Sequence, residues 1–184
     1  MSDKKATLSI DGKTLELNVH SGTIGPDVIE VGPLTGNGYF TYDPGFTSTG
    51  SCESSITYID GDEGILLYRG YPIEELAEKA DFVEVCYLLI YGHLPSVEEL
   101  SDFRNSLTHH SLIHEDMKKF FEGYPPTAHP MAILSAMVAS LSAYYPEEDG
   151  DTNIIRLLAK LNTIAAFSYK KSIGQPYIYP RNDL

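Results

Sequence analysis

Apolar and polar residues alternate along the first twenty positions, on both sides of the pair Asp11-Gly12. Such alternation is typical of strands with one buried face, and Asp-Gly is a strong signal for a tight hairpin turn. The same pattern returns at 55–59 and 65–68, around a turn-rich run. The sequence therefore predicts two β-hairpins. A connector rich in Gly, Pro, Ser and Thr is expected between them, with one short strand at 38–42.

Helical signals follow the second hairpin. Arg69-Gly70 is expected to turn the chain, because glycine tolerates the backbone angles of a tight turn. Pro72 suits the first position of a helix, where its missing N–H group is not needed. A helix is therefore expected from this proline through Ala80.

Two further helices have strong start signals. Asp81 and Ser96 are each followed three residues later by a glutamate, which predicts a capping box at the start of each helix. The first helix is expected over 82–91, with Gly92 as its stop. The second is expected to run to about His109.

The last two predicted helices carry apolar residues at spacings of three and four. One starts at Pro130, and the other is expected from about Thr152 to Lys171. Both apolar stripes are expected to face a core. The stripes consist of Met131, Leu134, Val138, Leu141 and Tyr145 in the first helix, and Ile154, Leu157, Leu158, Leu161 and Ala165 in the second.

The pattern as a whole predicts a mainly α protein. Residues 1–50 are expected to form a small β-rich N-terminal region with its connector. Residues 51–184 are expected to form the second hairpin and the first helices of a large helical domain. The last residues carry no closing element, while the helices before them still have apolar faces to cover. This pattern predicts a piece of a longer protein.

Composition narrows the class of protein. Thirteen Lys and Arg residues against twenty-six Asp and Glu residues give a net charge of −13 at pH 7. This balance argues against nucleic-acid binding, which needs a basic face to neutralise phosphates. No apolar run approaches the ~20 residues that span a bilayer, and the N-terminus lacks the apolar centre of a secretory signal. A cytoplasmic protein without a membrane partner is therefore expected.

Few residues form a pattern with known chemistry. Cys52 and Cys86 are isolated and are expected to be free thiols. His110 and His114 would share a face on a continuous helix, but no further ligands lie at useful spacing, so no metal site is expected. The chain contains no phosphate-binding loop, dinucleotide fingerprint or nucleophile elbow.

The basic pair Arg156 and Lys160 is four residues apart on the last predicted helix, so both side chains should project from one face. Such a pair could form a clamp for an anion. It could equally be a solvated basic stripe beside an apolar face. Spacing alone leaves both interpretations open.

Four long segments, in one order, resemble the citrate synthase family. They are DPGFTSTGSCESSITYIDGDEGILLYRGYPIEELAE at 43–78, EVCYLLIYGHLP at 84–95, HPMAIL at 129–134 and SIGQPYIYPRNDL at 172–184. The N-terminal hairpin and the first segment are similar to the bacterial hexameric type, which NADH inhibits. The resemblance implies a citrate synthase-like helical domain preceded by a small β-rich region, in truncated form.

The resemblance implies a parent enzyme that condenses acetyl-CoA with oxaloacetate in the tricarboxylic acid cycle, giving citrate and CoA without a required cofactor. In the family the catalytic His and Asp residues lie beyond the PRNDL segment, so no catalytic residue is expected in this chain. The parent is expected to be a homo-oligomer, a hexamer of dimers. The alternatives are a free-standing nucleotide-binding regulatory module without catalysis and a structural helical domain that binds nothing.

The resemblance also implies that part of an allosteric NADH site lies in this chain. In the family's pattern, one run of the site reads Arg-His-Thr-Met, where this chain has a histidine, not an arginine, at its first position. Histidine is charged only below about pH 6.5. NADH binding is therefore expected to be weaker than in the family's tight binders and to strengthen as the pH falls toward 6. The implied residues are His109, His110, Ser111, Leu112, Tyr145, Arg156 and Lys160.

Overall fold

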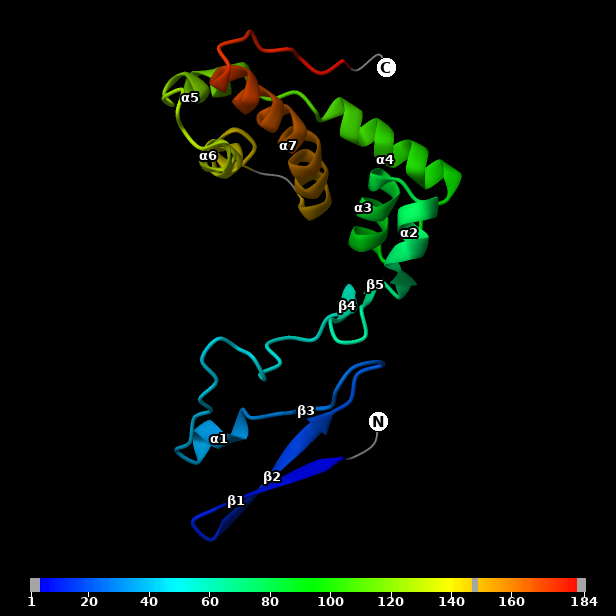
Figure 1. The fold of residues 1–184 in the computed structure, drawn as a ribbon, viewed down its shortest axis with the longest axis vertical. Helices are drawn as coiled ribbons and strands as arrows, with labels where there is room; N and C mark the ends of the chain where they lie inside the picture. Colours follow the sequence, from blue (N-terminus) through cyan, green and yellow to red (C-terminus); the bar gives the residue numbers. More distant parts are fainter. Residues whose placement is uncertain (1–3, 147–148, 182–184) are drawn as a thin grey trace. The chain divides into compact units, whose positions relative to one another are not determined.

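Two three-stranded sheets and seven α-helices make up the part of the chain that the computed structural model describes, residues 4–146 and 149–181 (Figure 1). These elements fall into two compact units, divided between Leu94 and Pro95. The change of composition near residue 50 thus lies inside the first unit, and the assignment of 51–184 to a larger helical domain stays a prediction. None of the described helices is long and apolar enough to cross a membrane.

The first sheet begins with the hairpin predicted around Asp11 and Gly12. β1 (Lys5–Ile10) pairs antiparallel with β2 (Lys13–His20), and β3 (Val28–Ile29) joins the far edge of β2. Both turn residues have positive φ, 50° and 77°. A two-residue turn of this kind matches the twist of its strands. The hairpin prediction is confirmed.

The strand predicted at 38–42 is wrong: no strand is assigned to this described stretch. A single helical turn, α1 (Pro33–Gly36), comes before it, and the Asn37 side chain donates to the carbonyl of Pro33. Gly38 then takes a left-handed φ of 83°. The alternating aromatic residues failed as a strand signal because no neighbouring strand supplies backbone partners for this stretch.

The second predicted hairpin is confirmed by the sheet of β4 (Thr57–Asp60), β5 (Ile65–Tyr68) and β6 (Tyr71–Pro72). Arg69 and Gly70 turn the chain with φ of 50° and 89°. β6 was not foreseen, because two residues are too few for an alternating pattern.

Two helices complete the first unit, α2 (Ile73–Lys79) and α3 (Phe82–Tyr91). Pro72 is the extended cap of α2, with ψ of 137°, and the helix begins one residue later than predicted. The capping box at the start of α3 is present as predicted, and Gly92 ends the helix with a left-handed φ of 88°.

Arg69 ties the second sheet to the end of α3. Its Nη2 and Nε atoms donate to the carbonyl of Leu89 at 2.8 Å and 3.3 Å. Its Nη1 atom donates to the hydroxyl of Ser55 at 3.0 Å. One guanidinium group therefore satisfies a carbonyl at the C-terminal end of a helix and holds the start of the hairpin.

The second unit is helical. It contains α4 (Val97–His109), the 3₁₀ turn η1 (Glu115–Met117), α5 (Lys118–Glu122), α6 (Pro130–Tyr144) and α7 (Gly150–Ser172). The second predicted capping box is present at the start of α4. α5, α6 and α7 enclose a core whose most deeply buried side chains are Met117, Phe121, Ile133, Met137, Ile164 and Phe167.

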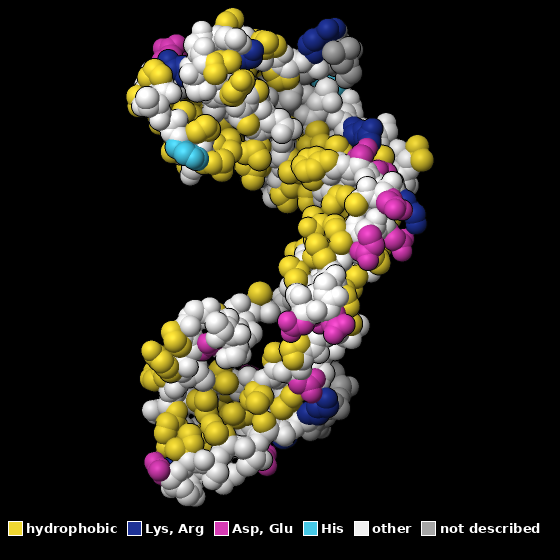
Figure 2. Space-filling view, in the orientation of Figure 1, with side chains coloured by type: hydrophobic (Ala, Val, Ile, Leu, Met, Phe, Trp, Pro, Cys, Tyr) yellow, Lys and Arg dark blue, Asp and Glu magenta, His cyan; other side chains and the backbone are white. Residues whose placement is uncertain are grey.

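The apolar stripe predicted to face the core on α7 is largely wrong. Ile154, Leu157 and Leu161 keep between 36% and 44% of their surface exposed, and hydrophobic side chains are visible on the surface of the helices in Figure 2. The buried face carries Ala159, Lys160, Thr163, Ile164, Phe167 and Ser168. α7 is apolar on two faces, and Phe121 of α5 and Tyr177 after α7 pack against the face with Phe167.

On α6 the prediction is closer. Leu134, Val138 and Leu141 pack against the core as expected, but Met131 at the first turn is 61% exposed. The deepest positions are Ile133 and Met137, which lie beside the predicted stripe. The stripe was therefore placed about one residue away from the centre of the buried face.

Candidate functional site

A buried lysine is the centre of the candidate site. Lys160 lies in the middle of α7 and is only 4% exposed. Its Nζ atom donates to the carbonyl of His110 at 2.8 Å and to the carbonyl of Leu112. Both carbonyls belong to the loop that follows α4. A lysine is almost never this deeply buried unless it is paired, and here backbone oxygens pair with it.

Tyr145 lies beside two basic residues of α7, Arg156 and Lys160. Its ring centroid is 5.0 Å from Cζ of Arg156 and 4.6 Å from Nζ of Lys160. These are cation–π distances, and such contacts are stronger when the cation is shielded from water. Burial raises the pKa of Tyr145, while a hydrogen bond with the backbone of His114 and the charge of Arg156 act against this rise.

The loop between α4 and η1 is held at a third carbonyl. The hydroxyl of Thr163 donates to the carbonyl of Ser111 at 2.7 Å. Three successive carbonyls, those of residues 110–112, are thus bound by two side chains of α7. Thr163 was not among the predicted site residues. Its position three residues after Lys160, on the same face of one helix, was the available signal.

Two opposing effects act on the charge of Lys160. Burial, followed by the nearby charge of Arg156, lowers the pKa of Lys160 to about 8. The two carbonyls and the Tyr145 ring favour the ammonium form. The ammonium group is therefore not part of a solvated stripe, and its hydrogen-bond acceptors are backbone carbonyls. An anion would have to replace backbone oxygens as its partner.

The histidines near this loop have separate structural roles. His109 and His110 donate from Nδ1 to the carbonyls of Asn105 and Ser106, both at 2.8 Å, and so satisfy the last turn of α4. His114 accepts from the backbone N–H of Asp116 and caps η1. α4 ends before His110, so the condition for a shared helical face with His114 is not met.

The structure brings together six of the seven predicted site residues. His110, Ser111 and Leu112 take part through their carbonyls, and Tyr145, Arg156 and Lys160 through their side chains. The side chain of His109 contacts its own helix instead. Within residues 4–146 and 149–181, no group of three or more His, Cys, Asp or Glu side chains is placed to hold a metal ion.

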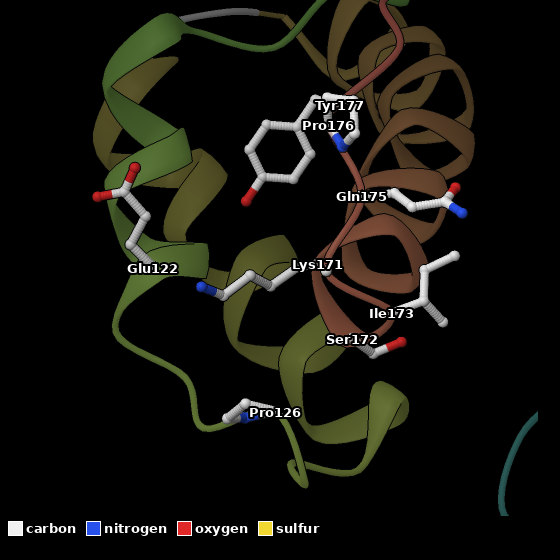
Figure 3. A pocket seen from close by; sticks show the side chains of 9 residues that line it. Glu122, Pro126, Lys171, Ser172, Ile173, Gln175, Pro176 and Tyr177 are labelled. Carbon is white, nitrogen blue, oxygen red and sulfur yellow. The ribbon is translucent and has the colours of Figure 1, made fainter.

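A cleft of about 640 Å³ lies away from this cluster, at the C-terminal end of α7. Figure 3 shows side chains from α5, from the end of α7 and from the following segment around it, including Glu122, Lys171 and Tyr177. The Tyr177 ring stacks on Phe167 with centroids 4.6 Å apart, which fixes one wall of the cleft. None of the predicted site residues lines it.

The mainly helical fold, with small antiparallel sheets before the helices, defines the structural class of the chain. Comparison with known proteins narrows the class to one family. The family model described as citrate synthase, C-terminal domain, matches residues 45–184. The chain therefore belongs to the citrate synthase family.

Individual relatives agree with this assignment. Citrate synthase 1 of Mycobacterium tuberculosis is 52% identical over 191 aligned positions, which cover 100% of this chain and 44% of that protein. The crystal structure of citrate synthase from Thermotoga maritima has a TM-score of 0.68 at 34% identity and covers 78% of this chain and 38% of its own. That from Pyrobaculum aerophilum has a TM-score of 0.68 at 30% identity, with 91% and 42% covered. The chain thus spans less than half the length of these proteins.

Proposed function

We propose that the chain is the N-terminal part of a citrate synthase, an acyltransferase that condenses acetyl-CoA with oxaloacetate to give citrate and CoA. The observation that carries this proposal is 52% identity along the whole chain to a protein with that name. The 184 residues act as a scaffold and do not catalyse the reaction alone. The condensation needs a rigidly held base and a donor to the enolate oxygen, and we assign these groups to the remainder of the enzyme.

We also propose that the cluster around Lys160 is part of an allosteric NADH site. Two cationic side chains and a tyrosine ring from two helices, beside a loop of backbone groups, suit a ligand with phosphates and aromatic rings. Arg156, Lys160 and Tyr145 supply these groups. No cofactor is needed for the reaction itself, so NADH acts as an inhibitor only.

The parent enzyme is proposed to be a cytoplasmic homo-oligomer of the hexameric type. The exposed apolar face of α7, with Ile154, Leu157 and Leu161, supports association of chains. Apolar surface of this kind is rarely left in water when its residues are contiguous.

A chimera tests the proposed activity. Residues 1–184 would replace the aligned part of the Mycobacterium tuberculosis citrate synthase 1, and release of free CoA from acetyl-CoA would be measured with and without oxaloacetate. We expect the chimera to release CoA only with oxaloacetate, and the isolated chain to release none. The unaltered Mycobacterium tuberculosis protein is the matched control.

Each other outcome is decisive. A folded, assembled but inactive chimera would contradict the proposed activity, and release of CoA by the isolated chain would contradict its scaffold role. NADH binding by the isolated chain, together with an inactive chimera, would favour a nucleotide-binding regulatory module without catalysis.

A further inference from the structure

The ammonium group of Lys160 is occupied by the protein itself. Its hydrogen-bond acceptors are the carbonyls of His110 and Leu112, and the Tyr145 ring lies 4.6 Å away. Because the side chain is only 4% exposed, a ligand that used this lysine would have to move the loop or take the place of one of these acceptors. Ligand binding would therefore also change the bonds that hold the carbonyls of His110 and Leu112.

The exchange is favourable for one class of ligand. The ammonium group makes charge-assisted hydrogen bonds with carbonyl and phosphate oxygens alike, but a phosphate oxygen also carries negative charge, so its bond gains the attraction between opposite charges. Arg156 lies near the same ring, with Cζ 5.0 Å from its centroid, so a second cation adds to the attraction for a phosphate. A neutral ligand lacks this attraction and would not compete with two well-placed carbonyls.

The loop between α4 and η1 is held by two kinds of contact, one apolar and one polar. On one side, Ile113 and Met117 anchor its far end in the core, with 7% and 0% exposure. On the other side, Lys160 and Thr163 of α7 bind the carbonyls of residues 110–112. Between these anchors, Leu112 is exposed. Loss of the Lys160 bonds would release two of these three carbonyls and leave the bond from Thr163 to Ser111, while the apolar anchors hold.

We propose that Lys160 is a latch that a phosphate-bearing ligand opens: in the free protein it holds the carbonyls of His110 and Leu112, and on binding it transfers to the phosphate and releases the loop. This inference rests on the proposed nucleotide site and adds its mode of regulation. When the ligand is bound, the segment between α4 and η1 is therefore less ordered than in the free protein.

Hydrogen–deuterium exchange tests the latch on the 184-residue chain. Backbone exchange of residues 110–114 would be followed alone, with NADH, and with inorganic pyrophosphate as the phosphate chemistry without rings. We expect each ligand to speed exchange in this loop about tenfold, the effect of losing roughly one charge-assisted bond. The core segment around Phe167 should not change.

Two substitutions separate the latch from simple loss of packing. Lys160→Met keeps the unbranched stem of the side chain without the ammonium group, and should give fast loop exchange without ligand and roughly tenfold weaker NADH binding. Thr163→Val removes only the bond to Ser111, so binding and the ligand response should persist. Lys171→Met, further along α7, should behave as the unaltered chain.

The outcomes distinguish the latch from the site. Ligand binding that slows exchange in 110–114, or leaves it unchanged, would overturn the latch and leave the nucleotide site standing. No binding of NADH or pyrophosphate at millimolar concentration would overturn both. If Lys160→Met does not fold, a Thr163→Val chain whose loop fails to respond to bound ligand would overturn the latch.

Discussion

Replacement of Lys160 by methionine should change how stability depends on pH. The lysine is 4% exposed, and burial and Arg156 lower its pKa from 10.5 to about 8. Between these two values the unfolded chain keeps the proton while the folded chain has lost it. Stability therefore rises with pH through this window, because the unfolded state binds more protons. Methionine carries no proton and removes this contribution.

The size of the effect follows from the pKa difference. One pKa unit corresponds to about 1.4 kcal/mol, so a fall from 10.5 to about 8 penalises the folded state by roughly 3 kcal/mol at pH 7. About 2 kcal/mol of this penalty should be relieved between pH 7 and about 9.5. The carbonyls of His110 and Leu112 favour the ammonium form, so a smaller change would mean that they offset the burial.

Urea unfolding followed by far-ultraviolet circular dichroism would measure the effect. The unfolding free energies of the unaltered chain and of Lys160→Met would be compared at pH 7 and at about pH 9.5. Their difference should shift by about 2 kcal/mol in favour of the unaltered chain at the higher pH. Lys171→Met is the control, with no such shift. A difference that does not change with pH would refute the reasoning and show that the lysine titrates as it does in water.

Three further predictions concern binding, packing and association. NADH should bind more tightly at pH 6 than at pH 8, because the pKa of Lys160 is lowered to about 8 and its charge is partly lost at the higher pH, and Lys160→Met should abolish the difference; equal affinities in the unaltered chain would remove Lys160 from the site. Phe167→Ala should lower the unfolding free energy by roughly 3–5 kcal/mol, whereas Phe120→Ala, at a 47% exposed position, should lower it much less; similar losses would contradict the assigned core. The isolated chain should self-associate in light scattering, and Leu157→Lys should reduce this; a compact monomer at high concentration would argue against an adhesive α7 face.

The local elements could be predicted because their signals lie within a few residues of each other. The capping boxes at Asp81 and Ser96 involve a side chain and a backbone group only three positions apart. The turn at Asp11-Gly12 depends on backbone angles that few residue types accept. Such features form wherever the sequence occurs, so no tertiary information is needed.

The buried face of α7 could not be predicted from spacing. Two faces of the helix carry apolar residues, and which face is buried depends on Phe121 and Tyr177, which lie 46 and 10 residues away from Phe167 in sequence. The strand predicted at 38–42 failed for a similar reason, because a strand needs a partner that the sequence does not name.

The basic residues of the candidate site could be predicted from the sequence, but the backbone partners of Lys160 could not. The four-residue spacing of Arg156 and Lys160 placed them on one helix face, and the structure places both beside Tyr145. Spacing could not tell that backbone carbonyls would take up the ammonium group of Lys160, because those carbonyls come from a loop about fifty residues earlier. Thr163 was missed for the same reason.

The guanidinium of Arg69 joins two elements that are twenty residues apart in sequence. If the last turn of α3 unfolds, the Leu89 carbonyl moves away from Arg69. The guanidinium group is then no longer fixed in position, which weakens its bond to Ser55. Residues 55–92 should therefore open and close as one cooperative block, so that the hairpin cannot fray without the helix. A destabilising mutation in the hairpin should therefore also raise the opening rate of α3, and a mutation in α3 should do the same to the hairpin.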